Sequence, residues 1–155
     1  MIKIYEALGA VADGRVEIIP MAEVKPPPWE GAKVWSSSRN KFYEITYDPA
    51  ENAIMANDNG SYWKGYLGYP AIAYLMIIGT LSYEDEIGEL LKGIAWKDIN
   101  TKFKNDFDKV VAEILASKSK EDREKIESFV EKVAKEISEL KLRHLGKKKF
   151  PPDGY

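Results

Sequence analysis

The stretch Tyr69-Pro70-Ala71-Ile72-Ala73-Tyr74-Leu75-Met76-Ile77-Ile78 carries no charged side chain, and after the proline it has no polar face. A helix that is apolar on every side must be buried. Pro70 suits a first-turn position, because the N–H that proline lacks would have no partner inside the helix there. Gly79 can end the helix. The stretch therefore predicts a buried central helix around which the rest of the chain packs.

Residues 1–68 predict an antiparallel sheet of about five or six strands. The first two segments alternate on either side of Asp13-Gly14, a turn sequence, and predict a hairpin. The later segments are rich in β-branched and aromatic residues, which favour strands, and turn residues separate them. The expected strands cover residues 2–5, 15–19, 33–38, 41–47, 53–56 and 61–66.

Residues 69–146 predict a layer of about four helices, including the central one. Apolar residues recur at helical spacing after Ser82, Asp98 and Ser119, which are suited to helix starts. In the last segment the steps alternate between four and three, as in a heptad pattern, at Ile126, Val130, Val133, Ile137, Leu140 and His144. We expect the last two helices to form a long antiparallel hairpin.

These segments predict an α+β fold, in which a C-terminal helical layer covers an N-terminal antiparallel sheet. The chain of 155 residues is long enough for one domain with its own core. We expect a single domain over residues 1–146, mainly β in 1–68 and mainly α in 69–146. Residues 147–155 form a basic, proline-containing tail.

The composition restricts the chemistry of the protein. The absence of Cys excludes a disulfide framework and a cysteine nucleophile, and a single His excludes a cluster of imidazole ligands. We expect no metal site and no cofactor, and the sequence assigns no catalytic residue. Gln is also absent, whereas Lys and Glu are abundant, which is typical of proteins adapted to heat. A thermophilic source is therefore predicted.

The charge and hydropathy patterns bear on location. The longest apolar run, residues 71–78, is shorter than the roughly 20 residues needed to cross a bilayer. The first residues lack the basic and apolar regions of a secretory signal. The net charge of −2 argues against a surface that grips nucleic acid as a whole. We expect a cytoplasmic protein with no membrane partner.

A glycine-containing passage leads from a predicted strand into the central helix. Helix N-termini favour anions, because their backbone N–H groups are free and the helix dipole is positive there. The passage lacks the Gly-Lys-Ser/Thr ending of a phosphate loop and the third glycine of a dinucleotide fingerprint. The glycines alternatively permit a tight turn. The candidate ligand-binding residues are Arg39, Tyr62, Lys64, Gly65 and Gly68.

Basic residues gather near the end of the chain with no acid among them. Such a cluster can contact nucleic-acid phosphates or the acidic patch of a partner, although most such tails are simply solvated. The candidate contact residues are Lys141, Arg143, Lys147, Lys148 and Lys149.

Three functions are compatible with these patterns. The first is a non-enzymatic interaction or assembly module, whose helical hairpin binds a second copy or another protein. The second is a small-ligand protein, or an enzyme, that binds an anion such as phosphate at the strand-to-helix glycines. The third is a nucleic-acid accessory protein that uses the basic tail. The sequence favours the first.

Overall fold

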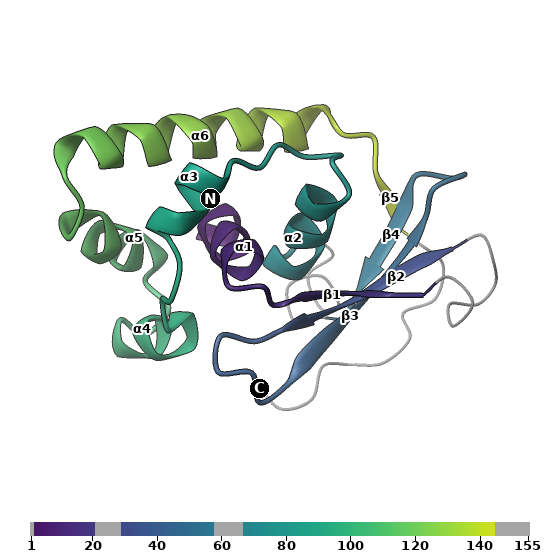
Figure 1. The fold of residues 1–155 in the computed structure, drawn as a ribbon, viewed down its shortest axis with the longest axis horizontal. Helices are drawn as coiled ribbons and strands as arrows, with labels where there is room; N and C mark the ends of the chain where they lie inside the picture. Colours follow the sequence, from purple (N-terminus) through teal and green to yellow (C-terminus); the bar gives the residue numbers. More distant parts are fainter. Residues whose placement is uncertain (1, 21–28, 58–66, 145–155) are drawn as a thin grey trace.

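The computed structural model describes residues 2–20, 29–57 and 67–144, which form helices and one sheet (Figure 1). The helices are α1 (Ile2–Ala12), α2 (Tyr69–Ile77), α3 (Asp85–Leu90), α4 (Trp96–Lys102), α5 (Phe107–Ala116) and α6 (Lys120–Glu139). The strands are β1 (Val16–Ile19), β2 (Glu30–Trp35), β3 (Phe42–Asp48), β4 (Ala53–Ala56) and β5 (Arg143–His144). The α+β class is confirmed.

The sheet is built mainly from the N-terminal half of the chain. Strands β1 to β4 are antiparallel neighbours in chain order. Two residues of β5 pair in parallel with β4. Within the described residues the N-terminal half therefore contributes four strands, and the expectation of five or six was wrong. The expected strand at 61–66 lies outside the described residues.

Helix α1 replaces the first expected strand. Residues 2–5 alternate, but a run of four residues cannot distinguish a strand from part of a helix. The segment continues with strong helix formers such as Glu6, Ala7 and Leu8, and these decide the conformation. Ala7 and Leu8 are completely buried. The predicted hairpin was wrong as well, because β1 pairs with β2 instead.

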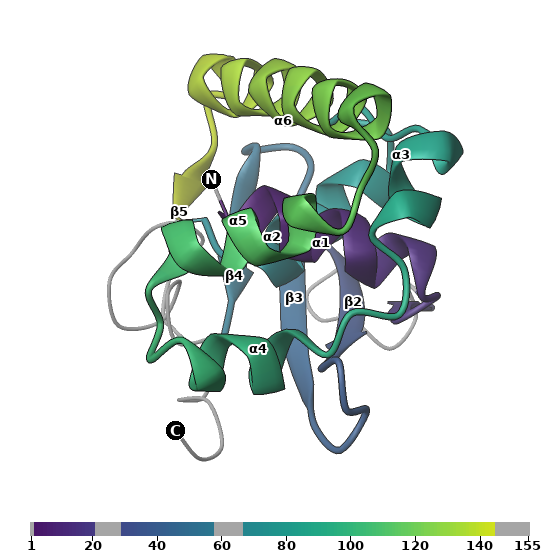
Figure 2. The ribbon, with the colours of Figure 1, turned by 90° about the vertical axis from the view of Figure 1, so that its left-hand side faces the viewer.

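Helix α2 is the central helix that the sequence predicts. Pro70 lies in its first turn, and residues 70–76 are all buried. Its last turn differs from the expectation, because Ile77 and Ile78 are 44% and 38% exposed. Helices α1 and α2 lie side by side between the sheet and α6 (Figures 1 and 2). The core is thus organised around a pair of buried helices.

The expected helix after Asp98 is two helices. Lys104 and Asn105 have φ values of 52° and 61°, in the left-handed region, and they separate α4 from α5. The Asp106 side chain then accepts a hydrogen bond from the Lys109 N–H and caps α5. Helices α2 to α6 make five among the described residues of this half, whereas about four were expected.

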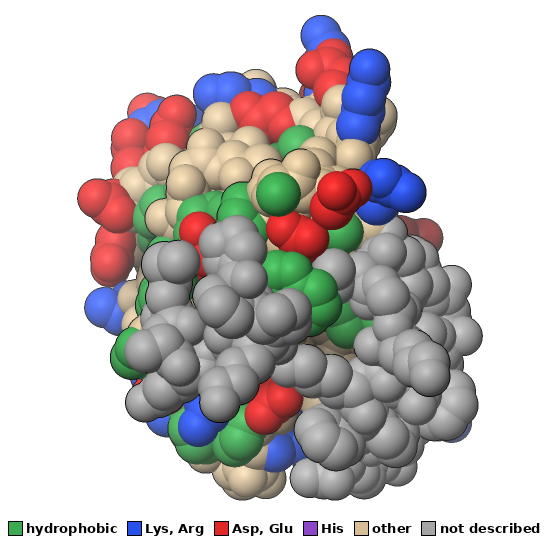
Figure 3. Space-filling model, turned by 90° about the vertical axis from the view of Figure 1, so that its right-hand side faces the viewer, with side chains coloured by type: hydrophobic (Ala, Val, Ile, Leu, Met, Phe, Trp, Pro, Cys, Tyr) green, Lys and Arg blue, Asp and Glu red, His purple; other side chains and the backbone are tan. Residues whose placement is uncertain are grey.

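Helix α6 places its apolar residues inward. Ile126, Phe129, Val130 and Val133 are buried, in contact with the α1 and α3 side of the core. Charged side chains gather along the upper part of the molecule in Figure 3, where α6 lies. The helix ends at Glu139, so His144 belongs to β5 and not to the apolar stripe. Among the described helices none is long and apolar enough to span a membrane.

Candidate functional site

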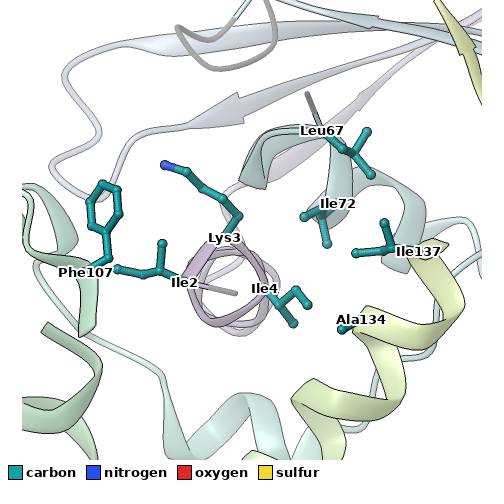
Figure 4. Close-up of a pocket in the computed structure, with 8 residues that line it drawn as sticks. All are labelled: Ile2, Lys3, Ile4, Leu67, Ile72, Phe107, Ala134 and Ile137. Carbon is teal, nitrogen blue, oxygen red and sulfur yellow. The ribbon is translucent and has the colours of Figure 1, made fainter. Parts of the chain in front are cut away.

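A pocket of about 440 Å³ opens where α1, α2, α5 and α6 meet (Figure 4). Small-molecule sites commonly have volumes of roughly 300–1,000 Å³ and mainly apolar walls. Of the described residues that line this pocket, seven are hydrophobic and one is a lysine. The lining residues are Ile2, Lys3, Ile4, Leu67, Ile72, Phe107, Ala134 and Ile137.

The pocket walls come from four separate parts of the chain. The first turn of α1 forms one wall, and Ile72 of α2 faces Ile137 of α6 across the space (Figure 4). Phe107, the first residue of α5, is 36% exposed and stands at the side of α1. Leu67 directly precedes Gly68, the N-cap of α2. The pocket therefore lies beside the strand-to-helix passage that the sequence singles out.

Lys3 supplies the only charge among the lining residues that the structure describes. Its Nζ lies 3.6 Å from Oε1 of Glu6, one turn further along α1, and 5.3 Å from the centre of the Phe107 ring. The Lys3 side chain is 28% exposed, whereas that of Glu6 is 6% exposed. A lysine held over an aromatic ring is attracted by the negative face of that ring. The apolar pocket thus has a positive charge at its wall.

Arg15 forms a buried polar group behind α1. It is 1% exposed, its Nε donates to Oδ2 of Asp13 at 3.2 Å, and its Nη1 donates to the Trp35 carbonyl at 2.9 Å. Burial raises the pKa of the nearby Tyr69 hydroxyl well above its ordinary value, and the charge of Arg15 partly offsets this effect. Tyr69 is therefore neutral near pH 7 and cannot serve as a base. We assign this group a structural role.

The structure separates the candidate ligand residues. Gly68 is buried at the start of α2. Arg39 lies in the turn between β2 and β3, and its Nη2 donates to the Asp13 carbonyl at 2.6 Å. Tyr62, Lys64 and Gly65 lie outside the described residues. A site that includes Gly68 and these three residues stays a prediction.

The basic candidates near the end of the chain are described in part. Lys141 and Arg143 are exposed beside β4. Nη1 of Arg143 lies 3.3 Å from Oε2 of Glu51, so part of its charge is already compensated. Lys147, Lys148 and Lys149 lie outside the described residues.

Lys3 and Glu6 are not among the candidate residues that the sequence indicates, because the alternation of residues 2–5 predicts a strand. The spacing of apolar residues in this segment could have predicted a helix. Ile4, Ala7, Leu8 and Val11 follow the spacing of a helix face. Lys3 and Glu6 are three residues apart, a distance that places them side by side on a helix.

A model of the family described as Uncharacterised conserved protein UCP014422 matches residues 1–143. The chain belongs to this family. No curated protein and no solved structure matches the chain. The family match extends from α1 to the first residue of β5, so it includes every residue that lines the pocket. The family description gives no activity.

Proposed function

We propose that this protein binds a small, mainly apolar ligand in the pocket between α1, α2, α5 and α6. The observation that carries the proposal is the pocket lining, which combines a volume of about 440 Å³ with seven hydrophobic side chains. Removing an apolar ligand from water into such a site is favourable roughly in proportion to the buried apolar area. The sequence also suggested a ligand-binding protein, with a site at the glycines that precede α2. The pocket proposed here lies beside that passage, at Leu67.

The rigidity of the surroundings also supports binding. Ile72 and Ile4 belong to α2 and α1, the two buried helices of the core. Side chains on such helices have little conformational freedom, so little entropy is lost when a ligand binds to them. The pocket is therefore a preformed site on the core of the protein.

A fluorescence titration tests the proposal. Nile red, a neutral dye that brightens in apolar surroundings, should bind saturably, and decanol should displace it. Ala134→Phe places a ring in the pocket and should weaken dye binding by about tenfold or more, or roughly 1.4 kcal/mol. Ala112→Phe is the matched control, because position 112 is exposed on α5. Absence of saturable binding, or an equal affinity in Ala134→Phe, would contradict the proposal.

Self-association through β1 is a second candidate function, favoured by the position of β1 at the edge of the described sheet. Among the described residues β1 pairs only with β2. The Trp35 N–H donates to the Arg15 carbonyl, so the backbone of residue 15 faces β2. Along an antiparallel strand, residues whose backbone groups face the partner alternate with residues whose groups face away. The backbone groups of Val16 and Ile18 therefore point away from β2. Ile18 is also 50% exposed. Two copies of β1 can pair about a two-fold axis.

This candidate relocates the interaction surface that the sequence suggests. The antiparallel pairing of the last two helices stays a prediction, and Ile126, Val130 and Val133 of the expected seam are buried in the monomer. Light scattering tests the β1 contact. The wild type should be dimeric, Ile18→Lys should be monomeric, and Ile78→Lys should remain dimeric as a control for loss of an exposed isoleucine. A monomeric wild type would rule the contact out.

We further propose that the protein acts in the cytoplasm of a heat-adapted organism. The absence of Gln and the abundance of Lys and Glu support the second part. A melting temperature above the mesophile range of about 45–65 °C is expected. A value inside that range would count against heat adaptation.

A further inference from the structure

We propose that the ligand of the pocket is an amphiphile with an apolar chain and an anionic head group, and that Lys3 binds the head group. The proposal rests on the ligand-binding function above and specifies its chemical class. A medium-chain carboxylate such as decanoate is the simplest member of this class. Lys3 is the recognition residue because it carries the only charge among the described residues that line the pocket.

The position of Lys3 fits this role. In Figure 4 its side chain leaves α1 on the side of Phe107, and its ammonium stands clear of the aliphatic side chains of Ile4, Ile72 and Ile137. The seven other described side chains of the lining offer an anion no hydrogen-bond donor. An apolar chain placed against the isoleucines would therefore have its charged end near Lys3.

The contacts that Lys3 makes with described residues leave its ammonium able to bind a ligand. Its Nζ lies 3.6 Å from Oε1 of Glu6. Short charge-assisted N–H···O bonds measure about 2.7–2.9 Å, so this ion pair lacks a close hydrogen bond. The ring of Phe107, 5.3 Å away, offers attraction but no lone pair. An ammonium has three N–H donors, and an incoming carboxylate can accept from them.

Glu6 positions the recognition residue. Its largely buried side chain has Oε1 3.6 Å from Nζ of Lys3, and this contact holds the Lys3 side chain at the pocket wall.

The test compares decanoate with decanol, two ligands with chains of equal length. Both are titrated by displacement of Nile red from the wild type, Lys3→Met and Lys92→Met. Lys92 is the matched control, because it is also paired with a glutamate three residues away, Glu89, at 3.8 Å. Both variants lose one positive charge from a lysine–glutamate pair, but only Lys3 lines the pocket.

The wild type should bind decanoate about 10- to 100-fold more tightly than decanol, which corresponds to roughly 1.4–2.8 kcal/mol. Lys3→Met should bring the ratio close to one by weakening decanoate binding, with decanol binding nearly unchanged. Lys92→Met should keep the wild-type ratio. A merely structural role of Lys3 would change the melting temperature without changing this ratio.

Two outcomes would overturn the proposal while leaving the ligand-binding function intact. One is a wild-type ratio near one with both ligands bound, and the other is a preference for decanoate that survives in Lys3→Met. Binding of neither ligand would overturn both. If Lys3→Met does not fold, Lys3→Gln makes the same comparison with a polar, uncharged side chain, and Lys3→Arg should retain the preference.

Discussion

Gly9 of α1 and Trp96 of α4 lie so close that a Cβ added to Gly9 would be 2.8 Å from the indole Nε1. The same Cβ would be 3.1 Å from the carbonyl oxygen of Leu91. Trp96 is 3% exposed, and the close packing of a protein interior resists displacement of a buried indole. The absence of a side chain at position 9 is what allows α1 to pack against this part of the helical layer.

Gly9→Ala should therefore destabilise the protein, although alanine favours helices more than glycine does. Overpacking costs about 1–3 kcal/mol, and the gain in helix propensity is about 1 kcal/mol, so we expect a net loss of roughly 1–2 kcal/mol. Urea denaturation followed by circular dichroism measures the change. In a Trp96→Phe background the loss should be smaller, because the clashing indole nitrogen is gone. An unchanged or increased stability of Gly9→Ala would refute the packing interpretation.

Arg15→Met should lower the free energy of unfolding by about 3 kcal/mol, because it removes the buried partner of a largely buried ion pair. The substitution leaves the Asp13 carboxylate and the Trp35 carbonyl without the guanidinium. Arg39→Met is the control, since Arg39 also contacts Asp13 but is exposed, and it should cost less than about 1 kcal/mol. Equal effects of the two substitutions would show that burial of Arg15 does not matter.

Stability should fall in alkaline solution because of Tyr74. Burial raises the pKa of its hydroxyl, and the hydrogen bond that it donates to Oε1 of Glu30 at 2.7 Å raises the pKa further. The folded protein then holds this proton more tightly than the unfolded chain, whose tyrosine titrates near pH 10. The contribution is complete below about pH 10 and decreases as the pH rises above that value.

Urea denaturation between pH 8 and pH 11 measures this dependence. Tyr74→Phe should have a flatter profile above pH 10 than the wild type, because it has no proton to lose at this position. A profile as steep as that of the wild type would assign the effect to other tyrosines.

Glu136→Ala should lower the melting temperature, because it removes the hydrogen bonds that connect α6 to the segment that precedes α3. The Glu136 carboxylate accepts hydrogen bonds from the backbone N–H of Ser82 at 2.9 Å and from the Ser82 hydroxyl at 2.5 Å. Losing bonds to a charged acceptor costs about 1.5–3 kcal/mol. Glu139→Ala, at an exposed position of the same helix, should change the melting temperature little. Equal shifts for the two variants would contradict a specific role of Glu136.

Local patterns predicted the elements whose conformation depends on neighbouring residues. The apolar run after Pro70 predicted α2, and Ser119 caps α6 as expected, with its Oγ accepting from the Asp122 N–H at 3.1 Å. The alternation around Ile45 predicted β3. Side chains return to the same face about every 3.6 residues in a helix and about every two residues in a strand. The spacing of apolar residues within one segment therefore indicates its conformation without reference to distant parts of the chain.

Tertiary structure decided what depends on distant contacts. The alternation of residues 2–5 fits a strand, yet these residues belong to a helix that buries almost every side against α2 and the layer around it. The pocket joins Lys3 to Leu67, Phe107 and Ile137, residues from four separate parts of the chain. No local period relates such positions. The sequence by itself therefore determined most elements and the α+β class, whereas only the packing of helices on the sheet brought one lysine to the wall of an apolar pocket.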